Sequence, residues 1–335
     1  MNTENEKVVF GLDEGAGALK VWSGIGGSQL LSMVATDGSM RSGRMAGMKK
    51  RKPPMRLTTA DGDFYVGPGS HDVGRPVDNL DHSRFSGSPE LKALSYGAMS
   101  LHLRPARQDQ VIDTLVVGLP IETLIGDQAD RTSASVREWM QGEHAWTVTG
   151  GTWGDEEMQY SVTVNTCRVT SQPVGAWADA LMDISGEWLP ERLKMKKQEV
   201  GVLSIGMNTI ETLVVKDRVP MERFTSGNTM GVRRLLELCD SSNLYSRGEL
   251  DTQLRDGTLD YRAALRVWTS DVRGIVESSW SRAWRRFAAV VVVGGGAVLL
   301  RDEMMRLFGS KMLLVNDPVL ATARGLYKLA RRSAR

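Results

Sequence analysis

Cysteine is scarce in this chain of 335 residues, which contains only Cys167 and Cys239. The two lie far apart in the sequence, and neither belongs to a pattern with the spacing of metal ligands. The sequence therefore predicts neither a disulfide framework nor a zinc site. We expect the protein to work in its reduced form, in a cytoplasm.

Long apolar runs and a large charge of one sign are also missing. The longest apolar run, at residues 287–293, ends in three glycines and is far shorter than the ~20 residues that cross a bilayer. The polar start of the chain lacks the apolar core of a signal peptide. A formal net charge of +2 is too small to attract nucleic acid by its field alone. We expect a cytoplasmic protein without a membrane partner.

The composition is that of a folded globular protein, with 41% hydrophobic and 24% charged residues. A chain of this length is long for one compact core and sufficient for two lobes of ordinary domain size. We therefore expect a cleft between two lobes.

Three glycine-rich loops, each beside an apolar strand, are the most informative feature of the chain. They cover residues 10–21, 202–211 and 290–297. Glycines let main-chain amides approach an anion where a side chain would block it. Loops of this kind near the start, past the middle and near the end predict two halves that close on one phosphate-bearing ligand.

The strand, loop, strand unit at the N-terminus recurs from residue 199, which indicates an internal duplication. We expect a first lobe over residues 1–180, with a small inserted subdomain at about 30–105. The second lobe is expected over residues 181–335, with its final helix packing back on the first. A basic segment at 38–54 is typical of a surface loop, with a polyanion-binding patch as the alternative.

Apolar spacing predicts the helices, and β-branched runs predict the strands. Helices are expected at residues 89–103, 132–140, from 172 onward, at 265–287 and at 318–330. Strands are expected at residues 8–12, 19–22, 64–66, 111–119, 145–149, 159–169 and 311–315. The tryptophans of the helix at 265–287 step by three or four residues, so we interpret them as core.

In order and spacing, these motifs resemble the actin-like ATPase superfamily, and within it the ParM-like plasmid-segregation actins. The matching segments are residues 11–20 and 206–211 for the two phosphate loops, 116–120 for a strand ending in Leu-Pro, 172–176 for the connecting helix, 227–232 for the start of a nucleotide-side helix, and 293–297 for the adenosine motif. The resemblance covers nearly the whole chain. It implies an α/β, actin-like fold of two lobes, with a nucleotide cleft between duplicated domains.

The resemblance also implies ATP and Mg²⁺ as cofactors and assigns the residues that hold them. The implied cofactor-binding residues are Gly15, Ala16, Gly17 and Lys20 in the first loop, Gly206, Met207 and Asn208 in the second, Gly227, and the triplet Gly294, Gly295 and Gly296.

Hydrolysis of ATP requires phosphate-binding amides, a metal and an aligned water rather than a covalent nucleophile. The resemblance implies that Asp13 holds Mg²⁺ through its water shell, since this ion keeps several waters and prefers carboxylates. Gln172 matches the catalytic Glu or Gln of the family, which orients the attacking water. Each site residue has a structural alternative: a turn cap for Asp13, a solvated lysine for Lys20, and a capping glutamine before proline for Gln172.

Two positions depart from the family pattern. Ser204 stands where the family usually has an acidic residue, and Ala16 where it often has a hydroxyl. Both changes weaken the contacts to the metal and to the γ-phosphate. We therefore expect slow hydrolysis, unless Glu211 or Glu14 compensates.

By resemblance, the protein is a ParM-like ATPase that assembles into filaments and hydrolyses ATP to drive plasmid DNA segregation. Its implied partners are further copies of the chain and a DNA-bound adaptor of the ParR type, so contact with DNA is indirect. Two alternatives stay open. One is a nucleotide-binding scaffold or switch with little hydrolysis, and the other is a small-molecule kinase of the same superfamily.

Overall fold

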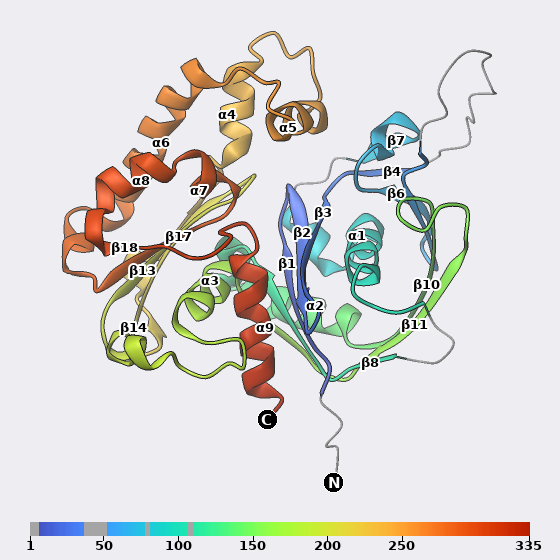
Figure 1. The fold of residues 1–335 in the computed structure, drawn as a ribbon, viewed down its shortest axis with the longest axis horizontal. Helices are drawn as coiled ribbons and strands as arrows, with labels where there is room; N and C mark the ends of the chain where they lie inside the picture. Colours follow the sequence, from blue (N-terminus) through green and yellow to red (C-terminus); the bar gives the residue numbers. More distant parts are fainter. Residues whose placement is uncertain (1–6, 37–51, 78–80, 106–109) are drawn as a thin grey trace.

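The computed structural model describes residues 7–36, 52–77, 81–105 and 110–335. Nearly all of the predicted basic segment at 38–54 lies outside these ranges. The described residues form three β-sheets, arranged in two lobes that lie side by side (Figure 1). We call the part with the five- and seven-stranded sheets the first lobe, and the part with the six-stranded sheet the second lobe.

The central sheet of the first lobe has the strand order β12-β9-β1-β2-β3. Its strands are β1 (Val9–Glu14), β2 (Ala18–Ser23), β3 (Gly26–Leu31), β9 (Thr114–Leu119) and β12 (Cys167–Ser171). Strands β1 and β2 form an antiparallel hairpin, and β9 runs parallel to β1. Because side chains alternate along a strand, Phe10 and Leu12 enter one core, whereas Val9 packs against Tyr327 of a helix on the other face.

The second lobe repeats this arrangement of a hairpin beside a parallel strand. Its strands are β13 (Val200–Ile205), β14 (Ile210–Lys216), β15 (Val219–Pro220), β16 (Ser226–Asn228), β17 (Ala289–Val293) and β18 (Met312–Leu313). Strands β13 and β14 are antiparallel, and β17 runs parallel to β13. The same pattern at the start of both lobes is what the duplicated sequence unit predicts.

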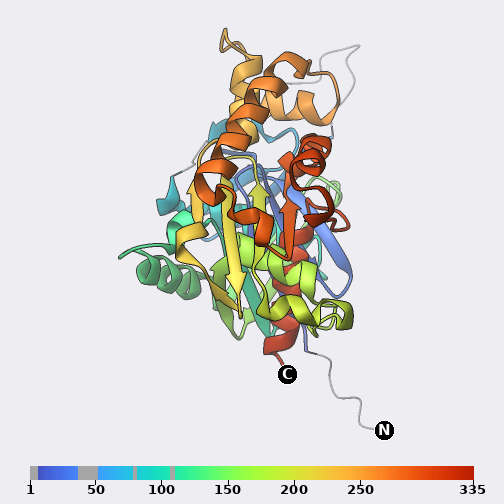
Figure 2. The same ribbon diagram turned by 90° about the vertical axis from the view of Figure 1, so that its left-hand side faces the viewer.

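Helices cover both faces of the second-lobe sheet. Leu203 and Val292 pack with helix α6 (Arg262–Trp280), which crosses in front of the strands in Figure 2. Val202 and Val291 point the other way and pack with helix α3 (Gln172–Leu181). Trp268 and Trp280 of α6 are fully buried, which confirms the interpretation of these tryptophans as core.

The prediction of one strand at 111–119 is wrong, because this segment is divided between two sheets, and the strand material predicted at 159–169 is divided in the same way. The seven-stranded sheet has the order β7-β4-β6-β5-β10-β11-β8. Its strands are β4 (Val34–Thr36), β5 (Met55–Thr59), β6 (Gly62–Val66), β7 (Arg75–Val77), β8 (Gln110–Ile112), β10 (Gly142–Thr149) and β11 (Met158–Val164). Asp113 separates β8 from β9 and accepts a hydrogen bond from the Val8 amide at 2.8 Å. The sheet joins segments on both sides of residue 105, so the boundary of the inserted subdomain stays a prediction.

The other helices are α1 (Pro89–Ser100), α2 (Ala129–Met140), α4 (Val232–Cys239), α5 (Arg247–Arg255), α7 (Gly295–Leu299), α8 (Arg301–Phe308) and α9 (Ala321–Ser333). The helix predicted at 265–287 ends early, at Trp280, because Ser281 adopts a positive φ of 46° that breaks the helix. Within the described parts of the chain, every helix is too short or too polar to span a lipid bilayer.

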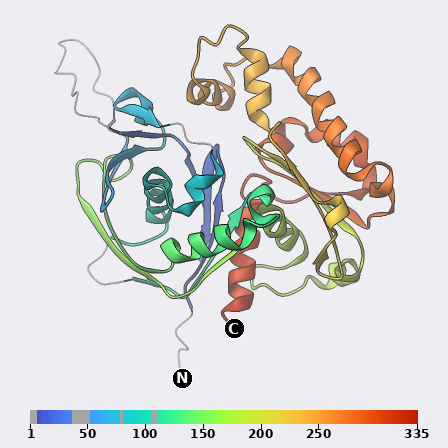
Figure 3. The same cartoon turned by 180° about the vertical axis from the view of Figure 1, so that it is seen from behind.

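Helices α3 and α9 pack together between the two central sheets (Figures 1 and 3). Their backbones touch, since a Cβ on Gly325 would lie 1.7 Å from the carbonyl oxygen of Gly175. The buried carboxylate of Asp179 accepts two hydrogen bonds from Arg324, at 2.7 and 2.6 Å. The ammonium of Lys328 lies 2.7 Å from the same carboxylate. This helix pair joins the two lobes at their base.

Candidate functional site

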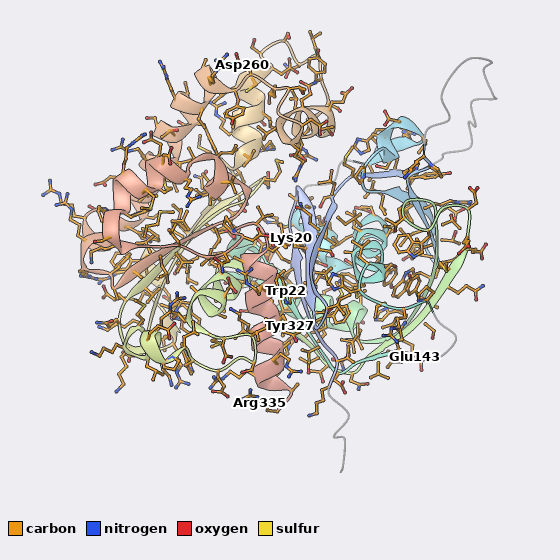
Figure 4. The ribbon with its side chains drawn as sticks, viewed as in Figure 1. Lys20, Trp22, Glu143, Asp260, Tyr327 and Arg335 are labelled. Carbon is orange, nitrogen blue, oxygen red and sulfur yellow. The ribbon has the colours of Figure 1, made fainter. Side chains whose placement is uncertain are left out.

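A cavity of about 280 Å³ lies between the lobes and is lined by residues of both. The turn of the β1–β2 hairpin contributes one wall, and the turn of the β13–β14 hairpin contributes the opposite wall. Helices α3, α4, α5, α7 and α9 and the short helix η2 (His82–Ser86) supply much of the rest. Figure 4 shows Lys20 facing the space between the lobes, whereas Glu143 and Asp260 mark their outer edges.

The structure brings most of the predicted site residues to this one cavity. Those that line it are Asp13, Gly15, Ala16, Gly17, Lys20, Gln172, Gly206, Met207, Asn208, Gly294 and Gly295. Segments separated by more than a hundred residues thus meet at a common space, as the three glycine-rich loops predict.

Two predicted residues, Gly227 and Gly296, do not line the cavity. A Cβ on Gly227 would lie 2.5 Å from Cγ of Glu122, on the first lobe. A Cβ on Gly296 would lie 2.2 Å from Cγ2 of Ile205. At both positions another part of the protein packs tightly against the glycine, which accounts for the absence of a side chain there.

In the first hairpin, Asp13 and Lys20 are cross-strand partners and share one face of the sheet. The Lys20 ammonium donates to Oδ2 of Asp13 at 2.9 Å, and the Lys20 side chain is 15% exposed. It is therefore an ion-paired group at the cavity and not a freely solvated lysine. A Cβ on Gly15 would lie 2.6 Å from the carbonyl oxygen of Ala18 and 2.8 Å from this ammonium, so a side chain there would crowd the turn.

The turn of the second hairpin meets that of the first. A Cβ on Gly17 would lie 2.7 Å from Cβ of Met207, so the two turns are in contact. Within the second turn, the Gly206 amide donates to the Thr209 carbonyl at 2.8 Å. The side-chain oxygen of Asn208 is buried and has no hydrogen-bond partner among the described residues. An unsatisfied polar atom of this kind is costly unless a ligand or water completes it.

Gln172 is the first residue of α3, and its side chain is free to bind a ligand or water. Gln172 is 8% exposed and lines the cavity, and its side chain makes no hydrogen bond with any residue that the structure describes. Ser171, not Gln172, occupies the N-cap position, and no side chain caps the helix. The structural alternative of a capping glutamine therefore has no support in the geometry.

Two buried carboxyls flank the cavity, at Glu14 and Glu211. Burial raises the pKa of Glu14 to about 7, although Arg84 and a hydrogen bond from Ser95 oppose this shift. Burial raises the pKa of Glu211 to about 8. Oε1 of Glu211 accepts from the Ile121 amide at 2.5 Å, while its Oε2 has no partner among the described residues. Because burial favours the neutral form of both carboxyls, neither group fully replaces the acidic charge that Ser204 lacks.

The sequence reasoning missed several residues of the second lobe that line the cavity. Leu254, Val298 and Leu299 give it apolar surface, and Arg255 donates to Asp251 at 2.9 Å in an ion pair that also lines it. The Ser246–Glu249 capping box at the start of α5 is a sequence signal that predicts this helix. No local pattern indicates that α5 reaches the cavity.

The sequence reasoning also missed the short helix η2, whose residues His82, Arg84 and Phe85 line the cavity. Asp81 begins this short helix by accepting a hydrogen bond from the Ser83 amide at 2.6 Å. The sequence signal for the turn is therefore local, whereas its position at the cavity depends on the packing of the whole lobe.

Comparison with protein families identifies part of the chain. Residues 11–175 match the model of the N-terminal domain of actin like proteins. No curated protein matches the chain significantly in sequence.

Solved structures match the chain over almost its full length. The crystal structure of actin-like protein Alp7A superposes with a TM-score of 0.74 at 14% identity, covering 98% of this chain and 97% of that one. An archaeal actin homologue in complex with ADP gives a TM-score of 0.68 at 18% identity and covers 97% and 99%. A ParM filament from Clostridium botulinum, described as 15-stranded, gives 0.68 at 14% identity and covers 98% and 99%. The chain therefore has the actin-like fold that its motifs predict, and its residues 11–175 match the N-terminal domain of actin like proteins.

Proposed function

We propose that the protein binds ATP in the cavity between its lobes and assembles into filaments, hydrolysing ATP as it does so. The observation that carries this proposal is the meeting of two glycine turns from opposite lobes at one cavity, with Gly17 against Met207. Turns of this kind present main-chain amides to an anion, and Lys20 adds a positive charge.

The two ends of the cavity differ in a way that suits a mononucleotide. The turns, Lys20 and Asp13 form a polar, charged end, while Leu254, Val298 and Leu299 form an apolar end. Stacking the base against Val298 and Leu299 buries its faces, and the phosphates then extend toward the turns. The Asp251–Arg255 pair also lines the cavity, where it can meet polar edges of the nucleoside.

The residues at the polar end fit a magnesium ion that keeps its water shell. Asp13 supplies one carboxylate at the cavity, and no cluster of three metal-ligating side chains occurs among the described residues. Mg²⁺ is typically held by one or two carboxylates together with substrate phosphates and water, so one carboxylate is enough. When bound, the ion would neutralise charge on the phosphates. Asp13 would hold it through water.

Hydrolysis requires an attacking water aligned with the terminal phosphate. The unpaired side chain of Gln172 projects from the start of α3 into the same cavity as Asp13 and Lys20, so its amide can accept a hydrogen bond from that water. A glutamine positions water without removing its proton, which is sufficient for phosphoryl transfer. Because Ser204 brings no charge to this end, we infer slow turnover.

Filament assembly is supported by the fold and by the solved structures that share it. One of these is a ParM filament and another is named as the Alp12 filament. We infer that copies of this chain are its first partner. Plasmid segregation through a DNA-bound adaptor of the ParR type is the cellular role that we propose for such a filament.

The test is assembly measured alongside phosphate release. Purified protein with ATP and Mg²⁺ should scatter light and sediment, whereas protein with ADP should do so less. Asp13→Ala should abolish both assembly and phosphate release. Asp260→Ala, which removes an exposed carboxylate at the outer edge of the second lobe, should match the wild type. Absence of assembly with every nucleotide would refute the filament.

A nucleotide-binding switch with little hydrolysis is the second candidate. Ser204 and the raised pKa of Glu211 favour it, because together they leave Asp13 as the main negative charge at the polar end. Tight ATP binding without phosphate release would select this candidate over the ATPase.

A further inference from the structure

The cavity contains a buried arginine that the proposed mechanism does not use. Arg84 lies in η2, is only 7% exposed, and lines the cavity together with Asp13 and Gln172. Burial lowers the pKa of its guanidinium, while Glu14 and Glu90 raise it. Arginine is nevertheless charged at any ordinary pH. A charge this deeply buried is retained only where anionic groups compensate for the loss of water.

The position of Arg84 places it at the polar end of the cavity. Its charge acts on Glu14, the residue that follows Asp13 in β1. Asp13 pairs in register with Gly118 of β9, where a Cβ would lie 3.5 Å from Cγ of Gln172. Arg84 therefore lies beside the strand that carries Asp13, and it lines the same cavity as Asp13 and Gln172.

The first lobe holds η2 firmly. Trp139 donates from Nε1 to the Phe85 carbonyl at 2.9 Å. Gly87, which ends the helix with a φ of 91°, packs so closely that a Cβ would lie 2.9 Å from Cγ of Trp139. The backbone that carries Arg84 is therefore fixed before any ligand arrives, which lowers the entropic cost of using the side chain for binding.

We propose that Arg84 binds the terminal phosphate of a bound nucleoside triphosphate and makes the protein prefer the triphosphate to the diphosphate. This inference rests on the proposed nucleotide site and identifies the residue that recognises the terminal phosphate. A guanidinium offers two parallel N–H donors that match phosphate oxygens, which Lys20, as a point charge, does not. With a diphosphate bound, Glu14 and Glu90 remain the carboxylates that compensate the guanidinium.

The test compares the affinities of ADP and of a non-hydrolysable ATP analogue, both with Mg²⁺, by calorimetry. Arg84→Gln should lower the affinity for the ATP analogue by at least about tenfold and the affinity for ADP by less than about twofold. Arg84→Lys keeps the charge without the paired donors, so its preference should fall between those of Arg84→Gln and the wild type. Arg255→Gln is the matched control, because it removes another arginine that lines the cavity, on helix α5 of the second lobe. It should change both affinities by a similar factor.

The ratio of the two affinities separates this role from a merely structural one. If Arg84 only stabilises η2 through Glu14 and Glu90, its replacement should lower the melting temperature and lower the affinities for both nucleotides by a similar factor. An unchanged ratio in Arg84→Lys and in Arg84→Gln overturns the proposal, and if Arg84→Gln does not fold, Arg84→Lys alone decides. A wild-type protein that binds neither nucleotide contradicts the proposed site itself, which is a different result from binding both without preference.

Discussion

At the residue scale, the buried carboxyl of Glu211 determines how stability depends on pH. Its pKa is about 8 in the folded protein, against an ordinary value of 4.5. The folded state therefore holds a proton that the unfolded chain releases between these two values. The resulting stability is fully present below pH 4.5 and is lost as the pH rises to about 8.

Glu211→Gln should remove this loss, because glutamine keeps an oxygen for the Ile121 amide and carries no charge. We expect the variant to become more stable than the wild type as pH rises, by on the order of 3 kcal/mol near pH 8. Urea unfolding from pH 4 to 9, without nucleotide or metal, measures the difference. Glu14 also lowers the unfolding free energy as the pH rises to about 7, but it does so equally in the wild type and in the variant. The difference between the two proteins therefore reports on Glu211. If their unfolding free energies depend on pH in the same way, the raised pKa does not belong to Glu211.

Sequence reasoning found the site residues that lie close together in the chain. Asp13 and Lys20 are neighbours because a hairpin turn of a few residues brings them opposite each other, and such a turn is visible in the sequence. Arg84 and Asp251 reach the same cavity from separate helices. Their positions depend on packing across the lobes, and no local spacing records that packing.

At the scale of elements, the contact between α3 and α9 depends on glycine. A Cβ at Gly325 would overlap the carbonyl of Gly175 at 1.7 Å, so Gly325→Ala must push the helices apart. We expect a loss of about 2–4 kcal/mol in unfolding free energy, since neither backbone can move without breaking the Asp179 ion pairs. Chemical denaturation measures this loss.

The matched control is Gly274→Ala in α6, where a Cβ would meet nothing within 4 Å. Alanine there should leave stability unchanged or raise it by up to about 1 kcal/mol, because it favours the helix. Equal effects of the two substitutions would show that the α3–α9 contact has room to adjust.

The type of most elements followed from periodicity, while their ends and sheet membership did not. The apolar run at 111–119 reads as one strand, yet Asp113 bends the chain and sends β8 and β9 into different sheets. Only the pairing partners, Val164 for Ile112 and Val9 for Thr114, reveal the division. These partners lie far away in sequence, so hydrophobic pattern alone does not identify them.

At the scale of the whole molecule, the lobes touch at the two hairpin turns and are joined at α3 and α9. Gln172 begins α3 and lines the cavity. The residue that we assign to water alignment is thus on the helix that connects the lobes. Relative movement of the lobes is therefore expected to change the position of Gln172 with respect to the phosphates.

Gln172→Ala should separate assembly from hydrolysis. The phosphate-binding turns, Lys20 and Asp13 remain, so the variant should still bind ATP with Mg²⁺ and sediment as filaments. Phosphate release should slow by at least about tenfold, because the attacking water loses the group that orients it. Filaments of the variant should then contain mainly ATP and persist after the wild-type filaments have disassembled.

Sedimentation, phosphate release and the nucleotide content of the pellet measure assembly, hydrolysis and the bound nucleotide. Release at the wild-type rate would assign the water to another residue, and loss of assembly would mean that Gln172 supports the closed arrangement of the lobes instead.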